Sequence, residues 1–375
     1  MQERDSYNMD GHKLMWHLDR VSQWQAGERV APLHVDMGIS AGCNMACTYC
    51  YGVIQGRTGF GTDIKGRFNM PEEAILRFFK DAKDIGIRSI ALIGEGENTL
   101  NPALCKSVDY AKGIGLDLGL ATNGIRIPRD PVELESLLTG LTWLRINISA
   151  GTKEAFEKIH QVPQYDRVLD NIDRMVKAKK KYGYPCTIGL QMVMTKENFD
   201  QVVPLAELGN QLDADYFVIK PCSDTSDYKL DSPKEEYIDN WDVFMEAKKF
   251  SKPGYEVIPK IVKLGNLGHK DYNVCFGTQF LIAVSGTGNV FPCGHWFDVR
   301  QEEFLMGNII EQSFKEIFES ERYWEVQQRV QAVNVNKDCE SNCRQHYLNR
   351  FLSDINGQPK DLKEPDFTPQ HVNFI

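Results

Sequence analysis

The sequence predicts an α/β fold in which a partial, open barrel of six parallel strands precedes a smaller C-terminal α+β domain. Between residues 33 and 222, short apolar runs alternate with amphipathic helical stretches. Strands that alternate with helices form parallel sheets with right-handed crossovers. A full TIM barrel has more strands than this stretch supplies, so we expect a partial (β/α)6 TIM-like barrel. A polar, turn-rich stretch at 222–236 then separates it from a mixed region.

The elements of the barrel follow in order. The helix at 71–86 has Pro71 at its start and Gly86 just past its end, as helix termini favour. The other expected helices are 101–112, 131–139, 166–181 and 198–211. The six expected strands are 33–40, 89–94, 116–122, 143–149, 186–194 and 216–221. Ligand sites in such sheets lie at the carboxyl ends of the strands, so we expect the functional residues there.

The rest of the chain is divided by its turn signals. A helix at 237–250 precedes FLIAVSGTGNVFPC (280–293), which predicts a β-hairpin turning at Gly286 to Gly288. Helices near 312–332 and 343–353 follow, and the proline-containing end (358–375) is expected to be extended. The expected domains are an N-terminal extension (1–30), the barrel (31–224), a linker and helical segment (225–265), the C-terminal domain (266–355) and a tail (356–375).

Composition narrows the function classes. The chain has 375 residues, 42% of them hydrophobic and 25% charged, with a formal charge of -9. This acidic balance disfavours general binding to nucleic acids or anionic membranes. No apolar run approaches the roughly 20 residues of a membrane-spanning helix, and the polar N-terminus lacks a signal-peptide pattern, so a cytoplasmic protein is expected. Ten cysteines in a reducing compartment indicate metal ligation or catalysis rather than disulfides.

Seven of the ten cysteines fall into two groups, of which the first directly follows the first expected strand. Its spacing is Cys-x3-Cys-x2-Cys, at Cys43, Cys47 and Cys50. Three thiolates on one short loop can ligate three irons of a [4Fe–4S] cluster and leave the fourth iron open. Three buried cysteines, or a zinc site that lacks one ligand, are the alternatives.

With Tyr49 just before the last cysteine, this motif resembles the signature of the radical S-adenosylmethionine (SAM) superfamily. The resemblance implies a [4Fe–4S] cluster that binds SAM and cleaves it to a 5'-deoxyadenosyl radical, which abstracts hydrogen from a substrate C–H bond. It also implies a reductant such as flavodoxin or ferredoxin.

The resemblance extends to the ends of later strands. Gly96 and Glu97 match the family's Gly-Gly-Glu-Pro segment, although Glu95 and Asn98 replace its first glycine and its proline. The resemblance places this segment at the SAM amino group and Tyr49 beside the adenine. It implies further SAM contacts at the ends of the third and fourth strands, from Thr122, Asn123, Asn147 and Ser149. Each of these residues alone would more often serve turn chemistry or strand capping.

The second cysteine group is Cys275, Cys293, Cys339 and Cys343. Four thiolates can fully ligate a second [4Fe–4S] cluster, and a structural zinc ion is the alternative. Cys275 followed by Gly288-x4-Cys293 resembles the SPASM and twitch extensions of some radical SAM enzymes. The upstream positions Val330 and Val333 are not cysteine, so the resemblance implies the twitch type, with one auxiliary cluster.

The substrate is less well defined by the sequence. Cys222 follows the sixth strand and could donate a hydrogen atom to a substrate radical, which would give epimerisation; a small buried core residue is the alternative. Lys220, Arg145 and His160 could bind an anionic group. We expect a carbohydrate, such as a nucleotide-sugar or an aminocyclitol, that is dehydrogenated or epimerised. A peptide or protein maturase, and a non-enzymatic zinc or iron–sulfur scaffold, are the alternatives.

Overall fold

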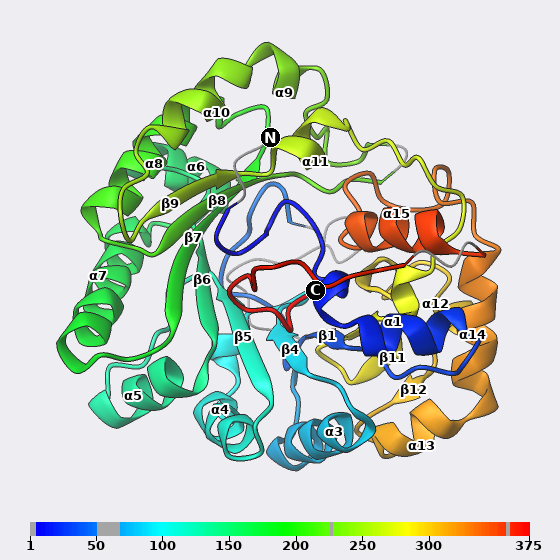
Figure 1. Cartoon of the computed structure of the whole chain (residues 1–375). Helices are drawn as coiled ribbons and strands as arrows, with labels where there is room; N and C mark the ends of the chain where they lie inside the picture. Colours follow the sequence, from blue (N-terminus) through cyan, green and yellow to red (C-terminus); the bar gives the residue numbers. More distant parts are fainter. Residues whose placement is uncertain (1–4, 51–67, 226–227, 358–360) are drawn as a thin grey trace.

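A computed structural model describes residues 5–50, 68–225, 228–357 and 361–375, and Figure 1 shows the whole chain. Within these residues the main sheet has ten strands in the order β12-β11-β10-β1-β4-β5-β6-β7-β8-β9. The six strands expected for the barrel are all present and pair in parallel. They are β1 (His34–Met37), β4 (Ser89–Leu92), β5 (Asp117–Thr122), β6 (Trp143–Asn147), β7 (Thr187–Met194) and β8 (Tyr216–Pro221). The predicted α/β fold is therefore confirmed.

The sheet extends beyond the six expected strands at both ends. β9 (Glu256–Pro259) pairs in parallel with β8, within a segment expected to be linker and helix. Its four residues, in a neighbourhood rich in lysine, glycine and proline, are too few to show a strand period, so only pairing with β8 defines the strand. At the other end β10 (Leu281–Val284) pairs in parallel with β1 and turns back into β11 (Asn289–Phe291) and β12 (Gly307–Asn308). The predicted hairpin is thus present, and it continues the barrel sheet.

Helices cover the outer face of the curved sheet (Figure 1). Pro71 and Gly86 flank α3 as predicted, and Gly86 has the left-handed φ of 99° that ends a helix. The crossover helices are α3 (Glu72–Ile85), α4 (Leu104–Gly113), α5 (Pro131–Gly140), α7 (Tyr165–Tyr182) and α8 (Val202–Gln211). A further helix, α6 (Lys153–His160), was not predicted and supports the first cysteine loop.

The remaining elements are short, and two of the predicted helices are interrupted. The helix expected at 237–250 divides at Asn240, and the one expected at 312–332 divides at Ser320, which caps its second part. The helices are α1 (Leu18–Gln25), α9 (Glu236–Asp239), α10 (Trp241–Lys248), α11 (Ile261–Gly265), α12 (Gln301–Phe304), α13 (Phe314–Glu319), α14 (Glu321–Gln331) and α15 (His346–Ile355). The strands β2 (Ser40–Ala41) and β3 (Phe68–Asn69) form a separate small sheet. None of the helices in the described parts of the chain is long and apolar enough to cross a membrane.

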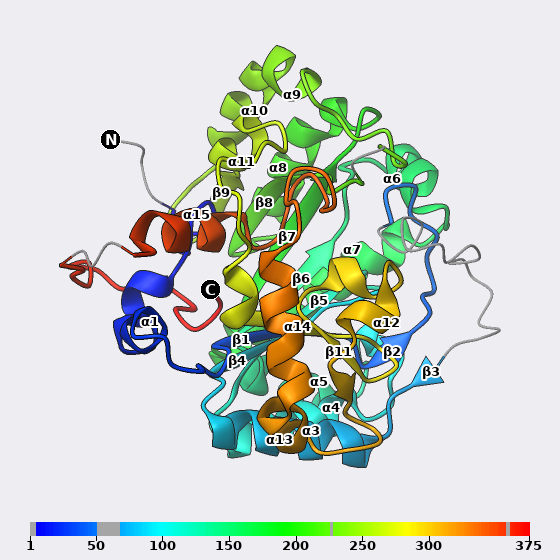
Figure 2. The same ribbon diagram turned by 90° about the vertical axis from the view of Figure 1, so that its right-hand side faces the viewer.

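Both chain ends pack against the inner face of the sheet, near the amino ends of its strands. The Tyr7 ring lies 4.9 Å from that of Tyr216, and the Phe374 ring lies 5.4 Å from Trp143. Lys13 Nζ donates hydrogen bonds to the carbonyls of Gln370 and His371, which joins the two ends. Figures 1 and 2 show the last residues crossing beside β1 and β4. The two ends therefore cover the part of the lumen that faces away from the cysteine loops.

Removal of the Phe374 ring should destabilise the protein. Phe374 is only 9% exposed and packs against Ala91 and Trp143, so the Phe374→Ala variant should lose about 3 kcal/mol of unfolding free energy. Phe367, in the same tail, is 37% exposed, and Phe367→Ala serves as the matched control with a smaller loss. Urea unfolding of both variants measures the difference. Equal losses would contradict a specific role for Phe374 in closing the lumen.

Candidate active site

The first cysteine loop begins after β2 and lies against the end of α6. Ala46 N–H donates to the His160 carbonyl at 3.2 Å, and Thr48 N–H donates to the Ile159 carbonyl at 2.9 Å. The loop closes on itself through a 3.1 Å bond from Cys50 N–H to the Cys47 carbonyl. Backbone bonds to a helix end thus hold the three thiols in place.

The environment of these thiols suits soft metal ligation. Burial raises the pKa of Cys47 well above its usual value, and the negative charges of Cys50 and Cys43 raise it further. The three sulfurs therefore lie within electrostatic reach of one another, and a cationic metal centre would favour their thiolate forms. Cys47 Sγ lies 3.0 Å from His160 Nδ1, and the other ring nitrogen of His160 lies 2.6 Å from the Ile148 carbonyl. Three thiolates on one loop fit a [4Fe–4S] cluster with an open iron.

Glu97 ties the ends of β4 and β5 to the cysteine loop. Its carboxylate accepts hydrogen bonds from the Thr122 hydroxyl at 2.8 Å and from Asn123 N–H at 2.8 Å. Its own N–H donates to the Gly42 carbonyl at 3.0 Å. Asn123 Nδ2 in turn lies 3.7 Å from Cys43 Sγ. These residues, predicted separately from three strand ends, form one network, in which a direct contact of Glu97 with SAM remains a prediction.

Gly96 is required by a close approach of two backbone segments. A Cβ atom on this residue would lie 2.3 Å from the Ser40 carbonyl oxygen and 2.8 Å from that of Gly42. Such distances are shorter than any van der Waals contact, so a larger residue would displace the loop that carries Cys43. Gly96 therefore acts on the cysteine loop through packing.

Tyr49, Asn147 and Ser149 also meet in space. The Tyr49 hydroxyl accepts a hydrogen bond from Asn147 Nδ2 at 2.6 Å and one from the Ser149 hydroxyl at 2.9 Å. Sequence reasoning missed Gln191, which donates to Asn147 Oδ1 at 3.1 Å and lines the same cavity. Gln191 lies within the apolar strand β7 and gave no local signal, since only the pairing of β6 with β7 brings it to Asn147.

The second cysteine group comes together from the segment before β10, the end of the hairpin and the loop before α15. Burial raises the pKa of Cys293 well above its usual value, and the charges of Cys343, Cys275 and Cys339 raise it further. Asn349 Nδ2 lies 3.5 Å from Cys275 Sγ, and Gln345 N lies 3.4 Å from Cys343 Sγ. Within the described residues, no three His, Cys, Asp or Glu side chains are gathered closely enough to hold a single metal ion. The donor set fits a fully ligated iron–sulfur cluster.

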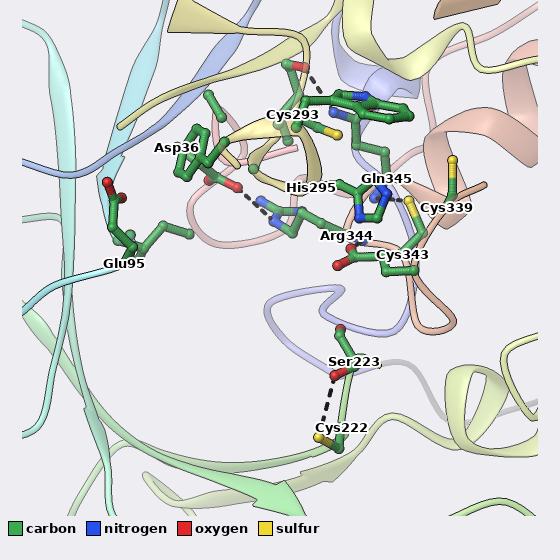
Figure 3. A pocket seen from close by; sticks show the side chains of 18 of the residues that line it. Asp36, Glu95, Cys222, Ser223, Cys293, His295, Cys339, Cys343, Arg344 and Gln345 are labelled. Atoms are coloured by element: carbon green, nitrogen blue, oxygen red, sulfur yellow. Dashed lines mark hydrogen bonds and ion pairs between the residues drawn. The ribbon is translucent and has the colours of Figure 1, made fainter. Parts of the chain in front are cut away.

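A single cavity of about 410 Å³ connects the two cysteine groups. Cys47 and Cys50 line it from the first loop, and all four cysteines of the second group line it from the C-terminal domain. Its other polar or ionisable lining residues include Asp36, Glu95, Asn147, Gln191, Lys220, Cys222, His295, Glu340 and Arg344. Figure 3 shows Cys222 and Ser223 facing Cys343 and Arg344 across this space.

Cys222 is held in the cavity wall by its backbone. Its N–H donates to the Tyr237 hydroxyl at 3.1 Å, and its carbonyl accepts from Asn342 Nδ2 at 2.7 Å. Asn342 directly precedes Cys343, so these contacts join the end of β8 to the second cysteine group. Burial raises the pKa of the Cys222 thiol to about 12, which keeps it protonated at neutral pH. Cys105 and Cys186 do not line the cavity.

Comparison with known proteins agrees with this geometry. The profile of the radical SAM superfamily matches residues 37–209, and that of the SPASM iron–sulfur cluster-binding domain matches residues 275–345. This chain is a radical SAM enzyme with a SPASM domain. The radical SAM domain implies a [4Fe–4S] cluster and SAM as cofactors, as predicted. The SPASM domain implies auxiliary iron–sulfur clusters, as predicted. The two cysteine groups lie within the two matched ranges.

This radical SAM enzyme is similar in sequence to several known proteins and similar in fold to solved structures. It is 26% identical to the AdoMet-dependent heme synthase of Methanosarcina barkeri, covering 77% of this chain and 83% of the relative. It is 24% identical to the tungsten-containing aldehyde ferredoxin oxidoreductase cofactor-modifying protein of Pyrococcus furiosus, with 76% and 80% covered. Streptococcus suis SuiB bound to S-adenosylmethionine shares the fold, with a TM-score of 0.62, 14% identity, and 84% and 72% covered.

Proposed function

We propose that this radical SAM enzyme acts on a small polar molecule, most simply a carbohydrate, held in the cavity between two iron–sulfur clusters. Cys43, Cys47 and Cys50 would hold the SAM-binding cluster, and Cys275, Cys293, Cys339 and Cys343 the auxiliary cluster. A reduced [4Fe–4S] cluster with SAM at its open iron supplies the 5'-deoxyadenosyl radical. The single observation that carries the proposal is that both cysteine groups and Cys222 line one cavity.

The size and lining of the cavity support a small molecule. A volume of about 410 Å³ lies within the range of small-molecule sites. The amide of Gln191 and the ammonium of Lys220 can bind hydroxyl and anionic groups. A cofactor-like molecule is the second candidate, because two relatives that are aligned over about four fifths of their length are named for heme synthesis and cofactor modification.

The position of Cys222 supports epimerisation as the outcome. The 5'-deoxyadenosyl radical takes a hydrogen atom from a substrate carbon, and the Cys222 S–H bond breaks to return a hydrogen atom to the opposite face of that carbon. The resulting sulfur radical takes up one electron, supplied by a reductant such as flavodoxin or ferredoxin, and one proton from solvent, which restores the thiol. Dehydrogenation is the alternative: the substrate radical would lose one proton to solvent and one electron, and the auxiliary cluster that the second cysteine group would hold could accept that electron.

Replacement of Cys222 tests the proposed outcome. In Cys222→Ala, SAM cleavage should continue while the epimerised product and its solvent deuterium are lost. The assay incubates sugars, nucleotide-sugars and aminocyclitols in deuterium oxide and measures product deuterium and 5'-deoxyadenosine. Cys186→Ala is the matched control, because Cys186 is buried away from the cavity. Deuterated, epimerised product from Cys222→Ala would refute the role of the thiol, and an oxidised product that needs no Cys222 would favour dehydrogenation.

A further inference from the structure

We propose that Lys220 binds an anionic group of the substrate, a carboxylate or a phosphate, at the Cys222 end of the cavity. This inference rests on the proposed function and narrows its substrate class. It distinguishes among the carbohydrates considered above, since nucleotide-sugars and sugar acids are anionic whereas aminocyclitols are cationic.

Strand alternation turns Lys220 towards the lumen. Lys220 pairs with Val193 of β7, and both residues line the cavity. Tyr216 and Val218, four and two residues earlier on the same strand, pack on Tyr7 inside the lumen. Cys222, two residues later, also lines the cavity. A substrate group bound to the ammonium would therefore lie beside the proposed hydrogen donor.

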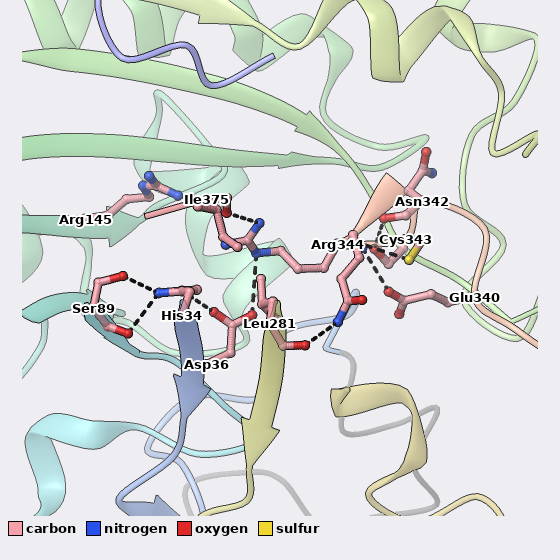
Figure 4. Close-up of polar contacts among 12 residues, drawn as sticks. His34, Asp36, Ser89, Arg145, Leu281, Glu340, Asn342, Cys343, Arg344 and Ile375 are labelled. Carbon is pink, nitrogen blue, oxygen red and sulfur yellow. Dashed lines mark hydrogen bonds and ion pairs between the residues drawn. The ribbon is translucent and has the colours of Figure 1, made fainter. Parts of the chain in front are cut away.

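Lys220 has no hydrogen bond or ion pair with any residue in the described part of the chain, although its side chain is partly buried. The Asp36 carboxylate, which also lines the cavity, is compensated by other groups of the protein. Asp36 Oδ2 lies 3.4 Å from Arg344 Nε, and Asp36 Oδ1 lies 3.0 Å from His34 Nε2. Figure 4 shows this group, with Arg344 reaching Asp36 and the Ile375 carbonyl. Asp36 is thus engaged by two partners, and within the described residues it forms no hydrogen bond or ion pair with Lys220.

Further positive charges surround Lys220. The pKa of Lys220 is lowered to about 8, chiefly by burial and also by the charges of Arg145 and Lys263. Lys263 and Lys260, near the end of β9, also have no ion pair within the described residues, and both are partly buried. An ammonium that is removed from water and repelled by like charges is favoured by an anionic ligand. Most of the charged groups that shift the pKa of Lys220 are therefore cationic, in a chain whose formal charge is -9.

The predicted SAM contacts lie on other strands. Thr122 and Asn147 end β5 and β6, and Asn123 and Ser149 follow these strands, whereas Lys220 is on β8. The carboxylate of SAM and the anionic group of the substrate are therefore expected at different places. The experiment must measure the binding of SAM and the binding of the anionic probe separately.

The test is isothermal titration of the anaerobically reconstituted, SAM-loaded protein. The probes are glucose 1-phosphate, glucuronate, neutral glucose and the cationic aminocyclitol 2-deoxystreptamine. At least one anionic probe should bind, and Lys220→Gln should raise its Kd by about tenfold or more, because bonds to charged groups are the stronger ones. Comparison of the two anionic probes distinguishes phosphate from carboxylate recognition. Lys229→Gln, at an exposed position, removes the same charge outside the cavity and should leave the Kd unchanged.

Each contrary outcome has its own meaning. If both anions bind Lys220→Gln as tightly as the parent, or if neither binds the parent, the inference is wrong. If Lys220→Gln weakens the binding of SAM and not that of the anionic probes, the lysine belongs to the SAM site and the inference is also wrong. If the parent protein forms no 5'-deoxyadenosine from SAM, the proposed function itself is refuted. This result is distinct from a failure of the anion-binding test. Circular dichroism of Lys220→Gln confirms that the variant is folded.

Anion binding should also weaken as the pH rises through about 8. Lys220 is charged below this pKa and neutral above it, so the favourable charge is lost in the alkaline range. Both anionic probes keep their charge between pH 7 and 9. The charged or titratable groups that act on Lys220 are Asp36 from β1, Arg145 from β6, Cys222, Lys263 from α11 and Arg344. Affinity that is independent of pH from 7 to 10 in the parent protein would count against Lys220 as the ligand.

Discussion

Cys47→Ala should reduce 5'-deoxyadenosine formation to the background of the uncatalysed reaction. Removing one of three thiolates leaves the first cluster with two protein ligands. Changing a mere neighbour of a metal ligand costs about 10- to 100-fold, so loss of the ligand itself should exceed that range. Anaerobic reconstitution, reduction with dithionite and chromatography of the nucleoside product measure the effect.

A cysteine outside both groups provides the control for this experiment. Cys105 lies on α4 and does not line the cavity, so Cys105→Ala should keep parental iron content and activity. Cys47→Ala should lose about four irons per chain, those of one cluster. Parental activity in Cys47→Ala would contradict the assignment of this loop to the SAM-binding cluster.

The second large effect is expected from Gly96→Ala. The added methyl group would lie 2.3 Å from the Ser40 carbonyl oxygen and 2.8 Å from that of Gly42, and both contacts are with backbone, so the loop must shift. A displacement of about 1 Å at a catalytic site can cost about 100-fold in rate. SAM cleavage should therefore fall by about this factor, while the circular dichroism spectrum stays close to that of the parent.

Gly113→Ala is the matched control, because the same methyl group at the end of α4 would meet no atom within 4 Å. This variant should retain full activity and gain slightly in stability, since alanine favours helix more than glycine does. If Gly96→Ala cleaves SAM as fast as Gly113→Ala, the close approach at Gly96 does not position the cysteine loop.

The parts of the fold that the sequence predicts well are those with long, periodic patterns. The strand expected at 186–194 is mostly apolar, and α3 begins and ends at proline and glycine signals, so both could be located within a residue or two. β9 could not be found, because four residues carry no period and the strand exists through its pairing with β8. That β10 extends the barrel sheet beside β1 depends on contacts between residues almost 250 positions apart, which no local pattern contains.

The same distinction between local patterns and long-range contacts applies to the candidate site. Cysteine spacing and strand-end residues identify the ligands and the SAM contacts as candidates, because their chemistry is visible in short motifs. Their mutual arrangement is not visible there. The bond from Asn147 to Tyr49 and the link from Asn342 to Cys222 join segments that are far apart in sequence. The same holds for the uncompensated charge of Lys220, which can be recognised only when the partners of Asp36 are known.

Iron quantitation on the anaerobically reconstituted parent protein, with Cys293→Ala beside it, tests the central claim that each cysteine group holds a cluster. The parent should contain about eight irons per chain and Cys293→Ala about four, with SAM cleavage persisting in the variant. A colourless parent protein that contains zinc and no iron would contradict the account, and so would equal iron contents in the two proteins.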